Sequence, residues 1–155
     1  MRQTYKILAH TIAGFVAIQA AVMVFAVAGL GLWISDGNSV SESNFNENSI
    51  PDFFGSIGLE LHGIFGTMVI PLLAIVLLIV SFFAKIPGGS KWAGFVLLAV
   101  LVQATLGIFG HVIAISGLLH GLNAFVLFSV ALQAGRRVST LPADVARTPE
   151  DAAAR

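Results

Sequence analysis

The sequence predicts an all-α integral membrane protein, a four-helix antiparallel bundle with both termini in the cytoplasm (N-in/C-in). Three observations predict this fold. The chain of 155 residues is 57% hydrophobic and 10% charged, whereas soluble domains carry about a quarter charged residues. It contains four apolar runs, and each is long enough for a bilayer crossing of about 20 residues. Its basic residues also lie at only one side of the predicted membrane.

The four helices are expected at about residues 6–34, 53–84, 92–113 and 117–137. The first apolar run is too long for a signal peptide, whose apolar core has about 7–15 residues. Within the second run, Pro71 lacks a backbone donor and predicts a kink. Trp92 begins the third run as an interfacial anchor. Residues 138–155 are polar and are expected to form a disordered cytoplasmic tail.

The orientation follows from the distribution of Lys and Arg. The first and third connections contain no basic residue, and the first connection carries four acidic ones instead. Because positive residues stay on the cytoplasmic side, both termini and the second connection are expected there. The predicted location is the cell membrane, as a multi-pass protein of a bacterial or archaeal plasma membrane. The basic residues are Arg2, Lys6, Lys85, Lys91, Arg136, Arg137, Arg147 and Arg155.

The residue types exclude several classes of site. The chain has no cysteine, which excludes disulfides, thiolate metal sites, iron–sulfur clusters and covalent c-type haem. The sequence contains no phosphate-binding loop, nucleophile elbow or H-E-x-x-H zinc motif. We expect the lipid bilayer as a partner and no nucleic acid.

Three of the four histidines are predicted to lie in the outer half of the bundle. Ionisable side chains within a bilayer are costly, so each is a candidate for function. At about 1.5 Å per residue, His62 lies about 34 Å from Lys85, and His120 lies about 24 Å from Arg136. His111 lies at a similar outer depth, whereas His10 is close to the inner face.

These histidines lie among glycines and apolar residues, which favours a membrane-embedded cofactor. We expect His62 and His120 to be the two iron ligands of haem b. His111 is either an alternative ligand, a partner of a haem propionate, or a polar residue near the loop. Nearby glycines would leave room for the porphyrin or would simply allow close helix packing. They are Gly63, Gly66 and Gly121, together with Gly107 and Gly110.

Other polar residues in the apolar runs have plainer interpretations. Gln19 and Gln103 lie at similar depths and are expected to bond to each other, joining the first and third helices. Asn123 follows His120 by one turn and can share its helix face. Glu60 would either orient a ligand on a neighbouring helix or be solvated at the outer surface.

Several motifs in residues 54–135 resemble those of a known family. They are Gly58-Leu-Glu60-Leu-His62, then Gln103-Ala-Thr-Leu-Gly107, and finally Leu119-His120-Gly-Leu-Asn123-Ala124. These resemble the second, third and fourth helices of one half of the haem A synthase family, whose fold comprises two four-helix halves. The resemblance implies a haem site at His62 and His120. The chain is also similar to short, uncharacterised four-helix bacterial membrane proteins with such histidines.

The chain differs from this family in three respects. The family's glutamate stands one residue further from the histidine than Glu60 does, and Gly63 stands where the family often has arginine. Only one four-helix half is present, so a second haem-bearing half would require a homodimer.

Three functions are therefore open at the level of sequence. The first is a b-type cytochrome that transfers electrons to a quinone or another membrane redox partner. The second is a haem-free accessory or structural subunit with interhelical histidines. The third is a haem-modifying enzyme related to haem A synthase.

Overall fold

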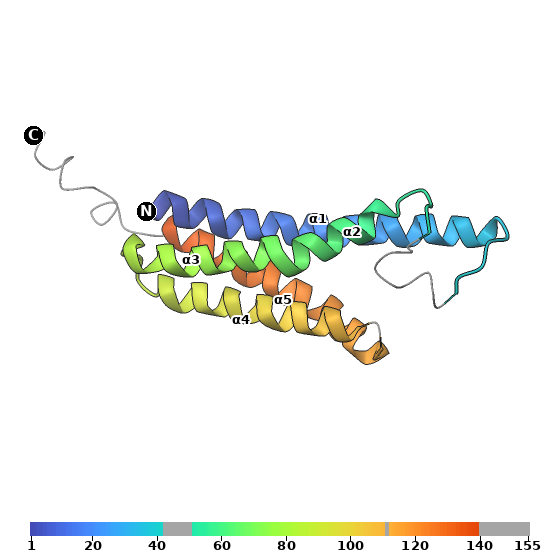
Figure 1. The fold of residues 1–155 in the computed structure, drawn as a ribbon. Coiled ribbons are helices and arrows are strands. Elements are labelled where there is room, and N and C mark those ends of the chain that lie inside the picture. The colour runs from blue at the N-terminus through green and yellow to red at the C-terminus, as the bar shows by residue number, and fades with distance from the viewer. Residues whose placement is uncertain (42–50, 111, 140–155) are drawn as a thin grey trace, which may run out of the picture.

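The computed structural model describes residues 1–41, 51–110 and 112–139, and over these residues it is helical without strands. Four of its helical segments are long and apolar enough to cross a membrane. This confirms the predicted all-helical class with four candidate spans and is consistent with a multi-pass membrane protein. The elements are α1 (Arg2–Ser35), α2 (Ile57–Ile64), the π-helical turn η2 (Phe65–Val69), α3 (Ile70–Ala84), α4 (Gly89–Phe109) and α5 (Ala114–Ser139) (Figure 1).

The helix boundaries differ from the predicted ones by a few residues. The second span begins at Ile57 rather than near residue 53, because Gly55 has a φ of +100° and breaks the helical path. α4 ends at Phe109 and α5 begins at Ala114, so the connection between them lies earlier than the one predicted between residues 113 and 117. α5 continues to Ser139, and the rest of the predicted tail lies outside the described residues.

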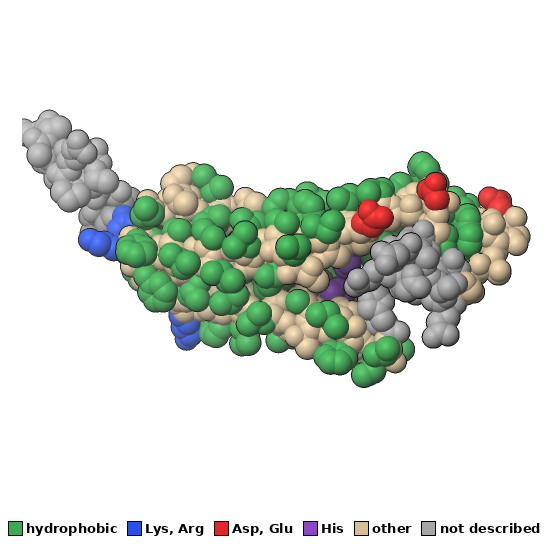
Figure 2. Space-filling view, in the orientation of Figure 1, with side chains coloured by type: hydrophobic (Ala, Val, Ile, Leu, Met, Phe, Trp, Pro, Cys, Tyr) green, Lys and Arg blue, Asp and Glu red, His purple; other side chains and the backbone are tan. Residues whose placement is uncertain are grey.

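Two contacts join the first turns of α1 to the turn between α3 and α4, and a third joins the start of α4 to the end of α5. The Tyr5 hydroxyl donates to the Gly89 carbonyl at 3.0 Å, and Arg2 Nε donates to the Ala84 carbonyl at 3.3 Å. The Arg137 guanidinium lies 4.9 Å from the centre of the Trp92 ring. Lys and Arg side chains gather at this end, and Asp and Glu side chains lie toward the other end (Figure 2).

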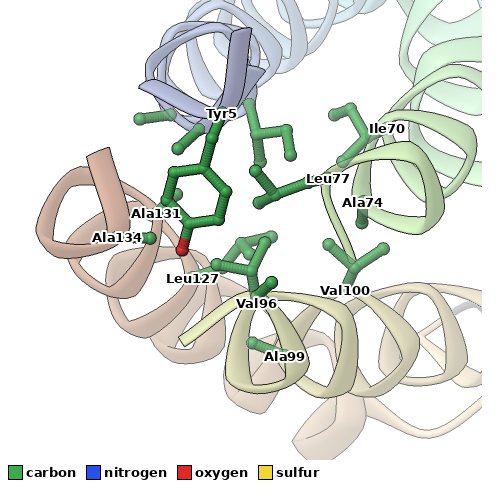
Figure 3. Close-up of a cluster of buried hydrophobic side chains, with 14 of the residues drawn as sticks. Tyr5, Ile70, Ala74, Leu77, Val96, Ala99, Val100, Leu127, Ala131 and Ala134 are labelled. Carbon is green, nitrogen blue, oxygen red and sulfur yellow. The ribbon is translucent and has the colours of Figure 1, made fainter. Parts of the chain in front are cut away.

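Small side chains fill most of the core, which lies nearer the basic end. Alanines from all four spans are fully or almost fully buried, so the helix backbones can approach closely. Tyr5 is the largest fully buried side chain and reaches from α1 toward α4 and α5 (Figure 3). The cluster also contains Ile12, Ile70, Ala74, Leu77, Val96, Ala99, Val100, Leu127, Ala131 and Ala134.

The second span changes its helical geometry just before Pro71, where the sequence predicts a kink. The π-helical turn η2 precedes the proline, and the Ile70 amide bonds to the Phe65 carbonyl five residues back. Because proline donates no backbone hydrogen bond, an irregular turn at this place costs the helix less. The Thr67 hydroxyl returns a hydrogen bond of 2.7 Å to the Gly63 carbonyl.

Glycines allow α2 and the segment before it to lie directly on the C-terminal half of α1. A Cβ atom on Gly58 would lie 2.8 Å from the Val22 carbonyl oxygen and 3.0 Å from Ala26 Cβ. A Cβ atom on Gly29 of α1 would likewise collide with the backbone carbonyl of Phe54. At this end of the molecule α2 therefore depends on α1 for its position.

We expect Gly58→Leu to force α2 away from α1, because the new side chain has no space there. The free energy of unfolding in mixed micelles should fall by about 1–3 kcal/mol, as for other overpacked sites. Gly14→Leu is the control, since a Cβ atom at Gly14 meets nothing within 4 Å. Equal stability of the Gly58→Leu and Gly14→Leu variants would contradict the close α1–α2 contact.

Candidate functional site

The structure brings His62 of α2 and His120 of α5 together. Their ring centroids are 5.9 Å apart, and the ring planes meet at 65°. Both residues are half-buried, and Figure 2 shows histidine atoms in a recess of the largely apolar surface. The third predicted histidine of this site, His111, lies outside the described residues.

Both ring nitrogens of His120 contact Gln103 of α4. Nδ1 lies 2.9 Å from the Gln103 carbonyl oxygen, and Nε2 lies 3.1 Å from the side-chain nitrogen of the same residue. Asn123 donates to Gln103 Oε1 at 2.7 Å and to the Ala99 carbonyl at 3.0 Å. His120 and Asn123 thus share a helix face and are linked through Gln103.

The ring of His62 has fewer hydrogen bonds than that of His120. Among the described residues, its Nδ1 is buried and has no hydrogen-bond partner. Its backbone carbonyl accepts a hydrogen bond of 3.1 Å from Gln19 Nε2, just before η2 begins. A buried polar atom without a partner is costly and marks a place where a ligand could bind.

The expected bond between Gln19 and Gln103 is wrong. Gln19 of α1 bonds to the His62 carbonyl on α2, and Gln103 of α4 bonds to α5 instead. The two amides lie at similar depths, but α1 and α4 present them to different neighbours. Sequence reasoning therefore missed Gln103 as a partner of the histidine. The available signal was a single amide in an apolar run, and this signal cannot identify its partner.

The nearby glycines have different roles. At Gly107 a Cβ atom would lie 2.9 Å from His120 Cε1, so this glycine makes room for the histidine ring rather than for a porphyrin. The space at Gly110 is filled by the backbone of Leu106, Gly107 and Gly117. At these two positions the close contacts agree with the alternative that the glycines allow close packing.

The three other glycines of the predicted site lie in more open surroundings. A Cβ atom on Gly63 or Gly121 would meet nothing within 4 Å, and one on Gly66 would meet only Gln19 Nε2, at 4.0 Å. Open space at these positions is compatible with a flat ring or with lipid chains.

The distance between the two imidazoles can be compared with that of two axial ligands of one iron, although both ring nitrogens of His120 face Gln103 in this structure. An imidazole nitrogen binds a first-row metal at about 2 Å, so two axial imidazoles stand with their ring centroids about 6 Å apart. The 5.9 Å between His62 and His120 is close to this value. The unpartnered nitrogen of His62 also fits a ligand role, whereas Gln103 would have to release Nε2 of His120.

The remaining candidates lie apart from this pair. His10 packs against Gly135 near the basic end, where a Cβ atom on the glycine would lie 2.7 Å from His10 Nε2. Glu60 is exposed. Within residues 1–41, 51–110 and 112–139, no group of three or more His, Cys, Asp or Glu side chains is arranged to hold a metal ion.

Comparison of the chain with protein-family models, with curated proteins and with solved structures found no match in any of the three.

We expect Gly107→Ala to displace the His120 ring and to weaken its bonds to Gln103. The free energy of unfolding of the haem-free protein should fall by about 1–3 kcal/mol. Gly121→Ala adds the same methyl group in open space on α5 and should cause no such loss. Both changes can be measured by SDS titration in mixed micelles, and similar unfolding curves for the two variants would contradict the fitted contact at Gly107.

Proposed function

We propose that this protein is a small membrane-embedded haem protein of b-type cytochrome character. His62 and His120 would be the two axial ligands of haem b. The observation that carries this proposal is the distance of 5.9 Å between their ring centroids, from two helices far apart in the sequence. When bound, the haem would supply an iron that exchanges single electrons.

The protein's own residues would hold the two imidazoles for this purpose. The Gln103 carbonyl lies against Nδ1 of His120, and such an outer contact orients metal-binding histidines and makes them better ligands. Gln19 bonds to the backbone of His62 at the start of the π-helical turn. Irregular turns of this kind are frequent at functional sites.

We further infer that the four spans form an antiparallel bundle with both termini in the cytoplasm. Supporting this, the first turn of α1 contacts the turn between α3 and α4, and the end of α5 contacts the start of α4. The described Lys and Arg residues lie at this end, as cytoplasmic ends require (Figure 2). The histidine pair then lies in the outer half of a plasma membrane, suited to a quinone or an extracytoplasmic electron partner.

A second candidate function is favoured by the hydrogen bonds of His120. Both of its ring nitrogens already contact Gln103, and Asn123 extends the same set of bonds. Such bonds hold transmembrane helices together without any cofactor. In this alternative the protein is a haem-free accessory subunit in which His120 joins α4 to α5.

The orientation can be tested with single cysteines, because the natural chain contains none. Asp36 follows α1 and Pro87 lies between α3 and α4, and both are exposed. We expect an impermeant thiol reagent added to intact cells to label Asp36→Cys but not Pro87→Cys. Inverted vesicles should give the opposite pattern. Labelling of both positions from one side would contradict the topology.

The haem proposal can be tested by the absorption spectrum of protein expressed with ample haem. We expect a Soret band with low-spin features in the natural protein. His62→Ala and His120→Ala should each lose haem or convert it to a high-spin form, since one axial ligand is removed.

His10→Ala is the matched control, because His10 packs against Gly135 away from the pair. Its spectrum should equal that of the natural protein. If the natural protein shows no Soret band, the haem-free function is the correct one.

A further inference from the structure

The hydrogen bonds around His120 have a fixed direction. A backbone carbonyl only accepts, so Nδ1 of His120 must carry the proton that it shares with the Gln103 carbonyl. A neutral imidazole then has its lone pair on Nε2. At this nitrogen the Gln103 side-chain amide is the donor, 3.1 Å away.

The orientation of the Gln103 amide is fixed from its other side. Asn123 uses its amide nitrogen to donate both to the Ala99 carbonyl and to Gln103 Oε1. Because the Ala99 carbonyl cannot donate, the Asn123 amide cannot be reversed without losing this bond. The oxygen of the Gln103 amide therefore faces Asn123, and its nitrogen faces His120.

We propose that Gln103 and Asn123 are positioning residues that set the state of His120. The Gln103 carbonyl selects the neutral tautomer with its lone pair on Nε2, the form in which histidine binds a metal. The Gln103 amide, held by Asn123, donates to this lone pair, which a metal would otherwise bind. The identity of that metal as haem iron rests on the function proposed above, whereas the state of His120 does not.

The sequence around Gln103 suits this role. Gly107 stands four residues later, one helical turn along, where a side chain would otherwise meet the His120 ring at 2.9 Å. The absence of a side chain there lets Nδ1 reach the Gln103 carbonyl. Among the described residues, the titratable group that faces His120 from another helix is His62, whose ring centroid is 5.9 Å away.

Two substitutions separate the carbonyl from the amide. Gln103→Leu removes the amide but keeps the backbone carbonyl, so the tautomer should persist while Nε2 becomes free. Asn123→Leu keeps the Gln103 amide but removes the group that holds it. Gln133→Leu is the matched control, since Gln133 is an exposed amide on α5, the helix that carries His120.

The first test uses haem-free protein labelled with ¹⁵N-histidine in lipid nanodiscs, with the His120 signals assigned by their loss in His120→Ala. We expect NMR to show protonated Nδ1 and hydrogen-bonded, unprotonated Nε2 in the natural protein. In Gln103→Leu the tautomer should be retained, and the Nε2 resonance should move to that of a free lone pair. Protonated Nε2 in the natural protein, or an unchanged Nε2 resonance in Gln103→Leu, would overturn the proposal.

The second test is haem titration of the same proteins. Removing a competing interhelical hydrogen bond should raise haem affinity by about threefold to tenfold in Gln103→Leu, with a smaller rise in Asn123→Leu. Both variants should be less stable without haem, and a gain in binding with a loss in stability is not expected of residues that only hold helices together. Gln133→Leu should change neither quantity.

The two proposals fail in distinguishable ways. A Soret band that forms equally well, or less well, in Gln103→Leu would overturn the positioning role while leaving the haem function intact. A lack of any Soret band would overturn the haem function, and the nitrogen resonances alone would then decide the state of His120.

Discussion

A polar group inside a bilayer has no water to bond with, and the arrangement of the histidine pair depends on this constraint. Such a group needs a partner within the bundle, and among the described residues the one buried side-chain atom that lacks a partner is Nδ1 of His62. Three amide side chains bond across helix boundaries: Gln19 bonds to the His62 carbonyl and Gln103 to the His120 ring. Asn123 bonds to Gln103 and to the Ala99 carbonyl. The polar side chains therefore lie between the helices, where α2 and α5 also bring the two imidazoles together.

Close backbone approach makes these bonds possible. Hydrophobic burial does little to join helices in lipid, so contact depends on small residues that let the helices fit together. Alanines allow close approach in the core, and glycines allow it at three contacts in the half of the bundle that carries the histidine pair. Because Gly58 has no side chain, α2 can pack against the backbone of α1, and because Gly29 has none, the Phe54 carbonyl can lie against α1. Gly107 leaves space on α4 for the His120 ring. The positions of both histidines thus depend on residues without side chains.

The irregular turn in the second span has a related consequence. η2 lies between His62 and Pro71, so it separates the helical turns that carry the histidine from those in the alanine-rich core. A π-helical turn holds an extra residue and rotates the helix before it relative to the helix after it. Gln19 bonds to the carbonyl just before this turn. The core and the histidine pair can therefore each adopt their own packing on one continuous span.

The sequence by itself determined that the protein has four apolar helices, where they lie within a few residues, and that all its basic residues avoid two of the connections. These properties follow from composition and local periodicity, because each residue meets lipid or water independently of the fold. The sequence also indicated that His120 and Asn123 share a face, since they are one turn apart.

Only the tertiary structure decided which polar groups meet. Gln19 and Gln103 are alike in type and depth, yet they bond to different helices, because the rotation of each helix selects its neighbour. In the same way, the local sequence does not distinguish Gly107 from Gly121. The space beside Gly107 is occupied by the His120 ring, whereas the space beside Gly121 is open. The depth of a residue follows from its position along one helix. Which residue it contacts depends on how two helices pack together, and only the tertiary structure determines that packing.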